Sequence, residues 1–298
     1  MNYLDCCTLC PKNCKVNRNN GEIGFCNATN KIKIAKYCLH FWEEPCISGN
    51  NGSGTIFFSN CNLKCIFCQN YDISTKNHGE EVSIEDFANI CINLQNNGAL
   101  NINLVTPTHF IPLIRDGLLL AKNKGLHIPI IYNTSSYENV NSLKLLEGLI
   151  DIYLPDLKYY DNKLAENFSK AKNYFSVAKE AINEMYRQVG TPKFNGNIMT
   201  KGVIVRHLLL PTHSDDSKKI LLYLHNTYKD NIYISIMNQY TPIRHIEKYK
   251  ELNNKVDDYE YDSLVNYACD IGITKAFIQE GETCSESFIP DFSIFSNK

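Results

Sequence analysis

Short apolar runs rich in isoleucine, valine and leucine recur along the chain from residue 55 onward. They lie at residues 55–59, 101–105, 128–133, 151–154, 203–210, 232–237 and 276–279. Within these runs, apolar residues mostly follow one another instead of alternating with polar ones. Strands that are covered on both faces have this pattern, which is typical of a parallel sheet.

Segments with helical periodicity separate the apolar runs, and several have recognisable ends. Ser83 and Asp86 have the spacing of a capping box, and the helix that follows is expected to end before Gly98. Glycine comes at or just after the ends of the helical segments 111–124, 140–147 and 173–188, as is common at a helix C-terminus. Two later helices are expected at residues 216–227 and 261–270.

Six or seven strand–helix units in succession predict an α/β fold, with a complete or partial β/α barrel as the first interpretation. An open doubly wound sheet is the alternative. In a barrel the functional loops gather at the carboxyl ends of the strands. Residues 1–50 lack this alternation. We therefore expect a Cys-rich extension at residues 1–50 and a barrel domain at residues 51–298.

Composition narrows the classes of protein to which the chain belongs. Its 298 residues are 44% hydrophobic and 21% charged, which is ordinary for a globular protein. The formal net charge is −2 and the basic residues are scattered, so we expect no nucleic-acid and no membrane partner. The first residues lack a secretory signal and no apolar run is long enough to span a bilayer, so we expect a cytoplasmic location.

Cysteine is abundant and clustered, with 13 residues in all. In a cytosolic chain such clusters indicate metal binding or catalysis rather than disulfides. Cys61, Cys65 and Cys68 have the spacing C-x3-C-x2-C directly after the first apolar run. Thiolates suit iron–sulfur clusters and zinc. A structural zinc site usually takes four ligands, commonly in two close pairs, and this loop offers three.

An iron–sulfur cube held by three cysteines keeps one iron open to a ligand that is not protein. The loop therefore predicts a reactive [4Fe–4S] cluster. Buried inert thiols, or a zinc site with a remote fourth ligand, are the alternatives.

The cysteine spacing, with Phe67 just before the third cysteine, resembles the signature of the radical S-adenosylmethionine (SAM) superfamily. The resemblance implies a partial (β/α)6-type barrel and a [4Fe–4S] cluster whose open iron binds SAM. One electron from a flavodoxin- or ferredoxin-type reductant would then cleave SAM to a 5′-deoxyadenosyl radical, which takes a hydrogen atom from a substrate. Phe67 would lie near the adenine, with simple core packing as the other interpretation.

The resemblance to known proteins extends beyond the cysteine loop. The segments at residues 41–45, 52–58, 101–109 and 156–158 resemble the PflX-like group, which is named for its similarity to the activating enzyme of pyruvate formate-lyase. It covers the chain from about residue 7 to residue 279. Such activating enzymes have a Gly-Gly-Glu motif after the second strand that holds the amino group of SAM.

In this chain Thr106-Pro107-Thr108-His109 takes the place of that motif. The hydroxyl groups of Thr106 and Thr108 can accept a hydrogen bond from an ammonium group, so both are candidate SAM contacts. His109 lies at the same strand end and suits a proton relay, a ligand or a structural role.

Four further candidates for the cofactor site lie at or near later strand ends, namely Asn133, Asp156, Lys158 and Arg206. Asn133 ends the third strand and offers an amide to ribose or methionine. Lys158 is a candidate for the methionine carboxylate or the ribose. Asp156 is expected to pair with Lys158 or to hold a cation, and a simple surface ion pair is the alternative for both residues. Arg206 is a candidate for a carboxylate because its guanidinium fork matches two oxygens. Gln239 is a candidate for the substrate pocket.

The N-terminal segment contains a second cysteine pattern, Cys7-x2-Cys10-x3-Cys14-x11-Cys26. A segment with so little apolar residue periodicity is most easily ordered around a metal. Zinc and an auxiliary iron–sulfur cluster both fit four thiolates, and free thiols are the third interpretation.

Three functional hypotheses follow. The first is a radical SAM enzyme that activates a glycyl radical enzyme, which needs an open barrel face to admit a loop of its partner. The second is a radical SAM enzyme that acts directly on a small molecule or peptide, for which an enclosed pocket is expected. The third is a non-catalytic iron–sulfur or zinc protein for redox or binding.

Overall fold

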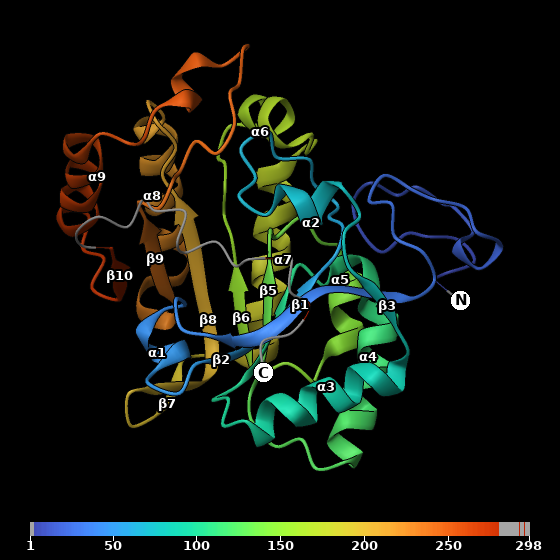
Figure 1. The fold of residues 1–298 in the computed structure, drawn as a ribbon. Helices are drawn as coiled ribbons and strands as arrows, with labels where there is room; N and C mark the ends of the chain where they lie inside the picture. Colours follow the sequence, from blue (N-terminus) through green and yellow to red (C-terminus); the bar gives the residue numbers. More distant parts are fainter. Residues whose placement is uncertain (1–2, 280–291, 293–294, 296–298) are drawn as a thin grey trace.

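The computed structural model describes residues 3–279 together with Phe292 and Phe295. The remainder of the predicted 51–298 domain lies outside the described residues. Seven parallel strands form the centre of one sheet, with helices packed outside it (Figure 1). In spatial order the strands are β10 (Ala276–Ile278), β9 (Tyr233–Met237), β8 (Ile198–Leu208), β6 (Ile152–Pro155), β5 (Ile130–Thr134), β4 (Ile102–Val105) and β2 (Ser53–Phe58). This confirms the predicted α/β fold with a parallel sheet.

Two antiparallel strands extend the sheet beyond β2. β1 (Ile32–His40) pairs with β2, and β3 (Glu80–Val82) pairs with β1. A further strand, β7 (Lys193–Asn195), pairs with the beginning of β8. Over the described residues β10 and β3 are the two ends of the strand order, so the sheet is an open, partial barrel. β1 is not among the strands predicted from the sequence, because it mixes lysine, tyrosine and histidine with apolar residues and lies in the Cys-rich part of the chain.

Helices connect the parallel strands. The long ones are α3 (Ile84–Asn96), α4 (Ile111–Asn123), α7 (Tyr174–Val189), α8 (Ser214–Tyr228) and α9 (Asp258–Asp270). The shorter ones are α1 (Pro45–Ser48), α2 (Tyr71–Thr75), α5 (Val140–Leu143) and α6 (Asn162–Ser169). Single 3-10 turns are η1 (Arg18–Asn20), η2 (Thr108–Phe110), η3 (Lys144–Leu146), η4 (Lys229–Asn231) and η5 (Lys250–Asn253). The predicted helix at 140–147 is split into α5 and η3.

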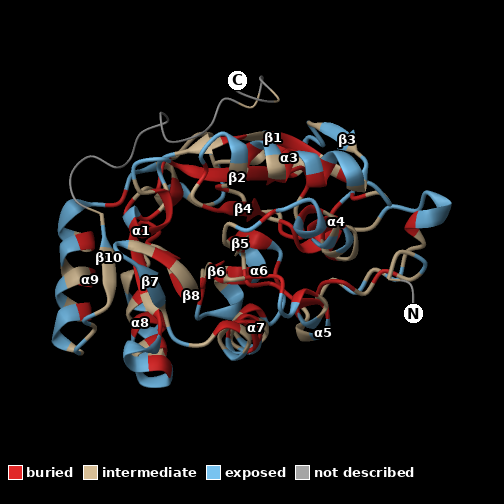
Figure 2. Cartoon of the chain, turned by 90° about the horizontal axis from the view of Figure 1, so that it is seen from below, coloured by how far each residue is buried: buried red, intermediate tan, exposed pale blue. Residues whose placement is uncertain are grey.

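The helix signals in the sequence correspond to real contacts at the start of α3. The Ser83 hydroxyl accepts from the amide of Asp86, and the Asp86 carboxylate accepts from the amide of Ser83, which is the predicted capping box. Buried residues cover the sheet and the inner faces of the helices, whereas the outer helix faces are exposed (Figure 2). The packed core therefore holds the sheet in place, and the sheet positions the loops at its carboxyl edge.

Residues 3–31 form loops with one short 3-10 turn and lie beside the sheet (Figure 1). Among the described residues no helix combines the length and apolar character needed to cross a membrane.

Candidate active site

A cavity of about 260 Å³ opens at the carboxyl edge of the parallel strands. The loops and strand ends of β2, β4, β5, β6, β8 and β9 all contribute to its wall. Among the predicted site residues, those that line it are Cys61, Cys65, Phe67, Cys68, Thr106, Asn133, Asp156, Lys158 and Arg206. The fold therefore brings together residues that are up to 145 positions apart in the sequence, as expected for the catalytic edge of a barrel.

The cysteine loop after β2 is held by backbone hydrogen bonds from another part of the chain. The amides of Lys64 and Ile66 donate to the carbonyls of Ser169 and Phe168, at 3.2 and 2.8 Å. From the other side, the Arg244 guanidinium donates to the Ile66 carbonyl at 2.7 Å. These hydrogen bonds hold the loop in place, and a preorganised loop lowers the entropic cost of assembling the site.

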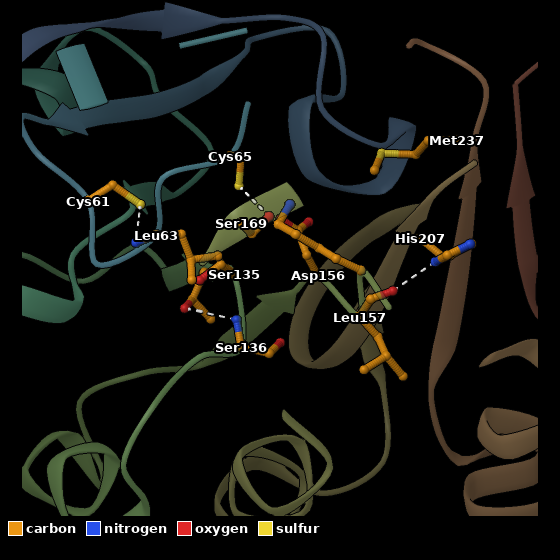
Figure 3. A network of polar contacts seen from close by, with 12 residues as sticks. Cys61, Leu63, Cys65, Ser135, Ser136, Asp156, Leu157, Ser169, His207 and Met237 are labelled. Carbon is orange, nitrogen blue, oxygen red and sulfur yellow. Dashed lines mark hydrogen bonds and ion pairs between the residues drawn. The ribbon is translucent and has the colours of Figure 1, made fainter. Parts of the chain in front are cut away.

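The thiols face the cavity and are partly buried. Burial raises the pKa of Cys65 to about 11, while the Lys158 ammonium and a hydrogen bond from the Ser169 hydroxyl act in the opposite direction. The Ser169 oxygen lies 3.0 Å from the Cys65 sulfur (Figure 3). Burial also raises the pKa of Cys61. Because burial disfavours the thiolate forms of Cys61 and Cys65, these forms need a bound metal centre or the nearby Lys158 ammonium to stabilise them.

The cysteine sulfurs surround a space instead of converging on one point. Within residues 3–279, no three side chains of the His, Cys, Asp and Glu types have the geometry of a site for a single metal ion. Cys61, Cys65 and Cys68 nevertheless line the same cavity. Three separated thiols around a shared hollow suit a polynuclear cluster, whose irons are each bound by a different cysteine.

Asp156 and Lys158 form an ion pair on the cavity wall. The Lys158 Nζ lies 2.6 Å from the Asp156 Oδ2, and both side chains are about four-fifths buried. Burial alone would lower the pKa of Lys158, but the charges of Asp156 and Cys65 raise it above its ordinary value. The ammonium therefore stays charged beside the thiols, and it can offer further donors to an anionic ligand.

Polar and aromatic groups complete the wall. Thr106 has a left-handed backbone with φ of 60°, and its amide donates to the Asn133 carbonyl at 2.9 Å. The Phe67 ring lies 5.9 Å from the Tyr240 ring, and both line the cavity. The wall thus offers hydroxyl and amide groups on one side and aromatic faces on another, as a nucleoside needs.

Two of the predicted residues, Thr108 and His109, do not line the cavity. The chain turns at Thr106 into η2, and this turn directs both side chains into the protein behind the cysteine loop. The Thr108 hydroxyl donates to the Glu138 carboxylate at 2.6 Å, and the His109 Nε2 lies 2.8 Å from the Ser59 carbonyl. Burial lowers the pKa of His109 to about 3, so the ring is neutral. Both residues follow the end of β4, as the sequence predicts, but the local turn decides where their side chains point.

Arg206 lines the cavity, but its carboxylate partners come from the chain itself. Its guanidinium makes ion pairs with Glu43 and Glu44, in the segment between β1 and α1. All three side chains are nearly buried. A second cavity of about 230 Å³ continues from this group, and its wall includes Trp42 and Gln279. No local pattern in the sequence marks this pairing, because only the fold brings Arg206 next to Glu43 and Glu44, which are 163 and 162 positions away.

The four N-terminal cysteines also come together. Cys7, Cys10, Cys14 and Cys26 line one small hollow of about 10 Å³ in the loops before β1.

Residues 55–224 match the family model described as the radical SAM superfamily. The chain belongs to the radical SAM superfamily. This segment contains the cysteine loop and strands β4, β5, β6 and β8 that carry most of the cavity wall. Membership implies a [4Fe–4S] cluster and SAM, and it makes the chain an enzyme of this superfamily.

Curated relatives support the same assignment. The chain is 31% identical over 277 residues to the uncharacterized protein MJ0674 of Methanocaldococcus jannaschii, covering 90% of this chain and 75% of that protein. It is 26% identical over 193 residues to the pyruvate formate-lyase-activating enzyme of Clostridium pasteurianum, covering 61% of this chain and 72% of that enzyme. The similarity to an activating enzyme predicted from the sequence is therefore confirmed.

Solved structures share the fold. Streptococcus suis SuiB bound to S-adenosylmethionine superposes with a TM-score of 0.52 at 14% identity, over 75% of this chain and 49% of SuiB. HydG, a maturase of the [FeFe]-hydrogenase, superposes with a TM-score of 0.51 at 15% identity, over 80% of this chain and 53% of HydG. The chain thus spans about half the length of these two proteins.

Proposed function

We propose that the chain binds a [4Fe–4S] cluster through Cys61, Cys65 and Cys68, binds SAM beside it, and abstracts a hydrogen atom from a polypeptide, as an activating enzyme of a glycyl radical enzyme does. The observation that carries the proposal is the shared cavity of the three thiols and the six strand ends. When bound, the cluster supplies the electron that cleaves SAM to a 5′-deoxyadenosyl radical. The chain's residues then have to bind, orient and shield the reacting groups.

Lys158 is the proposed contact for the methionine carboxylate of SAM. Its ammonium lies on the cavity wall and acts electrostatically on Cys65, and Asp156 holds it in place. Thr106 and Asn133 lie on the same wall and offer oxygen acceptors to the amino group or the ribose. Phe67 and Tyr240 form the aromatic side on which we place the adenine.

The second cavity is the proposed entrance through which the substrate reaches the first cavity. It shares His40, Glu43, Gln69 and Gln239 with the first cavity, so a group that enters it reaches the cluster loop. Trp42 on its wall is 63% exposed and the adjacent Phe41 is 50% exposed. Exposed aromatic side chains beside a polar opening favour a polypeptide partner. The open sheet order and the similarity to activating enzymes support the same choice.

Direct chemistry on a small molecule or peptide is the second candidate function. It is favoured by Thr106-Pro107-Thr108-His109, which replaces the Gly-Gly-Glu motif expected of an activating enzyme. Both candidates need an electron donor, for which we propose a flavodoxin- or ferredoxin-type protein in the cytoplasm.

The test is anaerobic reconstitution with iron and sulfide, followed by reduction in the presence of SAM. We expect 5′-deoxyadenosine from the parent protein and none from a variant in which Cys61, Cys65 and Cys68 are all replaced by alanine. Cys91→Ala is the matched control, because Cys91 is buried in α3 away from the cavity. If the parent and the triple variant give the same yield, the proposal fails.

A second experiment separates the two candidate functions. A glycyl radical enzyme deuterated at its glycines is supplied as the partner. Deuterium in 5′-deoxyadenosine, together with a glycyl radical signal in electron paramagnetic resonance, is expected for an activating enzyme. Abundant 5′-deoxyadenosine that contains no deuterium, with no glycyl radical signal, would instead favour direct chemistry on another substrate.

A further inference from the structure

We propose that Cys7, Cys10, Cys14 and Cys26 bind a second iron–sulfur cluster of the [4Fe–4S] type, with every iron held by the protein. This site is separate from the cavity described above, and it does not depend on what the radical attacks. Because it leaves no iron open, it would exchange or store electrons instead of binding SAM.

The loop geometry turns the four thiols toward one hollow. Residues with left-handed backbone follow three of the cysteines closely, at Asn13, Lys15 and Asn27. The amide of Cys7 donates to the Val16 carbonyl at 2.9 Å, and the Lys15 amide donates back to the Cys7 carbonyl at 2.9 Å. These bonds close residues 7–16 into a loop that contains three of the four cysteines.

The arrangement of the thiols favours a cluster over a zinc ion. A zinc ion bound by four thiolates has each sulfur at about 2.3 Å, so the four sulfurs must converge on one point. Within residues 3–279 no three Cys, His, Asp or Glu side chains are placed to hold one metal ion, although these four cysteines line the same hollow. The same holds for Cys61, Cys65 and Cys68, whose sulfurs also line a cavity without converging.

Arg18 is the second, independent observation. Its side chain is only 3% exposed, and Nη2 donates to the Cys7 sulfur at 3.0 Å and to the Cys26 sulfur at 3.6 Å. Nη1 donates to the His109 carbonyl at 2.6 Å, and Nε is buried without a partner in the described structure.

A buried guanidinium needs a compensating negative charge. None of the hydrogen-bond partners of Arg18 that the described structure shows is a carboxylate. A four-thiolate cluster carries net negative charge and would supply this compensation. Hydrogen bonds to cysteine sulfur are also among the main determinants of cluster potential, and the Phe25 amide adds another, to Cys14 at 3.3 Å.

Lys12 connects this site with the first cysteine loop. Its ammonium lies 3.8 Å from the centre of the Phe25 ring and donates to the Lys170 carbonyl. Lys170 directly follows Ser169, whose hydroxyl donates to the Cys65 sulfur. The ammonium interacts electrostatically with Cys10 and Cys14 on one side and with Cys61 and Cys65 on the other. The two cysteine sites are therefore neighbours around one cation, close enough for the charge of one cluster to act on the other.

Metal analysis of reconstituted protein tests the proposal without using activity. In a variant with Cys61, Cys65 and Cys68 replaced by alanine, we expect about four irons and four sulfides per chain and an iron–sulfur absorption spectrum. Adding Cys10→Ala and Cys14→Ala should remove both. Adding Cys6→Ala instead is the matched control, because Cys6 does not line the hollow and its loss should leave the iron in place.

Protein with only Cys10→Ala and Cys14→Ala controls for misfolding. We expect its iron to fall from about eight to about four per chain, with the remainder held by the first loop. One zinc per chain and no iron in the first triple variant would overturn the proposal, and so would the absence of any metal. Either result would leave the proposed SAM chemistry untouched, since that is tested with the first loop intact.

Discussion

The ammonium of Lys158 and the carboxylate of Asp156 lie 2.6 Å apart, both supplied by the chain just after β6. The pair stands on the wall of the cavity that contains the three cysteines of the first loop. Asp156 takes one of the three donors of the ammonium, so others remain for a ligand. An anionic group entering the cavity would thus meet a positioned cation next to Cys65.

Replacing Lys158 by methionine should weaken SAM binding. The change removes a charged hydrogen-bond donor but keeps an unbranched side chain of similar length. A charge-assisted hydrogen bond contributes about 1.5–3 kcal/mol, which corresponds to a loss in affinity of roughly 10- to 100-fold. Equilibrium binding of SAM to reconstituted protein measures the effect. Lys122→Met, on the exposed face of α4, is the matched control, and equal affinities for the two variants would remove Lys158 from the SAM site.

Replacing Arg206 by methionine should destabilise the fold itself. The change leaves the nearly buried carboxylates of Glu43 and Glu44 without their partner. Loss of one partner from a buried ion pair costs about 3–5 kcal/mol of unfolding free energy. Urea unfolding of the parent and the variant, both reconstituted with iron and sulfide in the same way, measures the change in unfolding free energy. Arg187→Met should have a much smaller effect because that side chain is half exposed, and a similar effect for both would contradict the role given to burial.

Replacing Ser169 by alanine should lower the reduction potential of the first cluster. Its hydroxyl donates to the Cys65 sulfur, and such a bond stabilises the more negative, reduced state. A hydrogen bond contributes about 1 kcal/mol, or about 40 mV for one electron. A redox titration followed by electron paramagnetic resonance checks the shift. Ser142→Ala is the control, since that hydroxyl is buried in α5 without a hydrogen-bond partner in the described structure. If the cluster in Ser142→Ala has a reduction potential as low as in Ser169→Ala, the prediction is wrong.

The buried ring of His109 should make stability fall in acid. Its pKa is about 3 in the folded chain, against about 6.5 when unfolded. Between these values the unfolded state binds a proton that the folded state does not. The free energy of unfolding therefore decreases as the pH falls from about 6.5, by up to about 1.4 kcal/mol per pH unit.

His109→Gln should remove this contribution, because the glutamine amide can still donate to the Ser59 carbonyl but does not titrate. Urea unfolding at pH 7, 6 and 5 should show the parent losing stability relative to the variant. His127→Gln, at an exposed position, is the control, and its unfolding free energy should fall with pH as it does in the parent. If the unfolding free energies of the parent and His109→Gln change with pH in the same way, the pKa of His109 is not lowered in the folded chain.

Much of the fold was predictable because its signals are local. A strand buried on both faces such as β6 is an unbroken apolar run in the sequence, and the capping box at Ser83 marks the start of α3. The spacing of Cys61, Cys65 and Cys68 carries its chemistry within eight residues. β1 gave no such signal, because polar residues interrupt it along its length.

The contacts that complete the site were not predictable, because they join distant parts of the chain. Ser169 reaches Cys65 across 104 positions and Arg206 reaches Glu44 across 162. No local pattern marks either pair. His109 shows the converse: its place at a strand end was clear, but the positive φ of Thr106 turns the chain so that the ring points away from the cavity.

The antiparallel pairing of β1 with β2 sets a limit on how the protein can be shortened. A cut at residue 50 would remove the N-terminal thiols together with β1, leaving β2 as a bare sheet edge. All six residues of β2 are buried, from Ser53 to Phe58, and three of them are Ile56, Phe57 and Phe58. An uncovered apolar edge strand recruits other chains and promotes aggregation. A shortened protein intended to lack only the thiol-bearing loops therefore has to begin before Ile32.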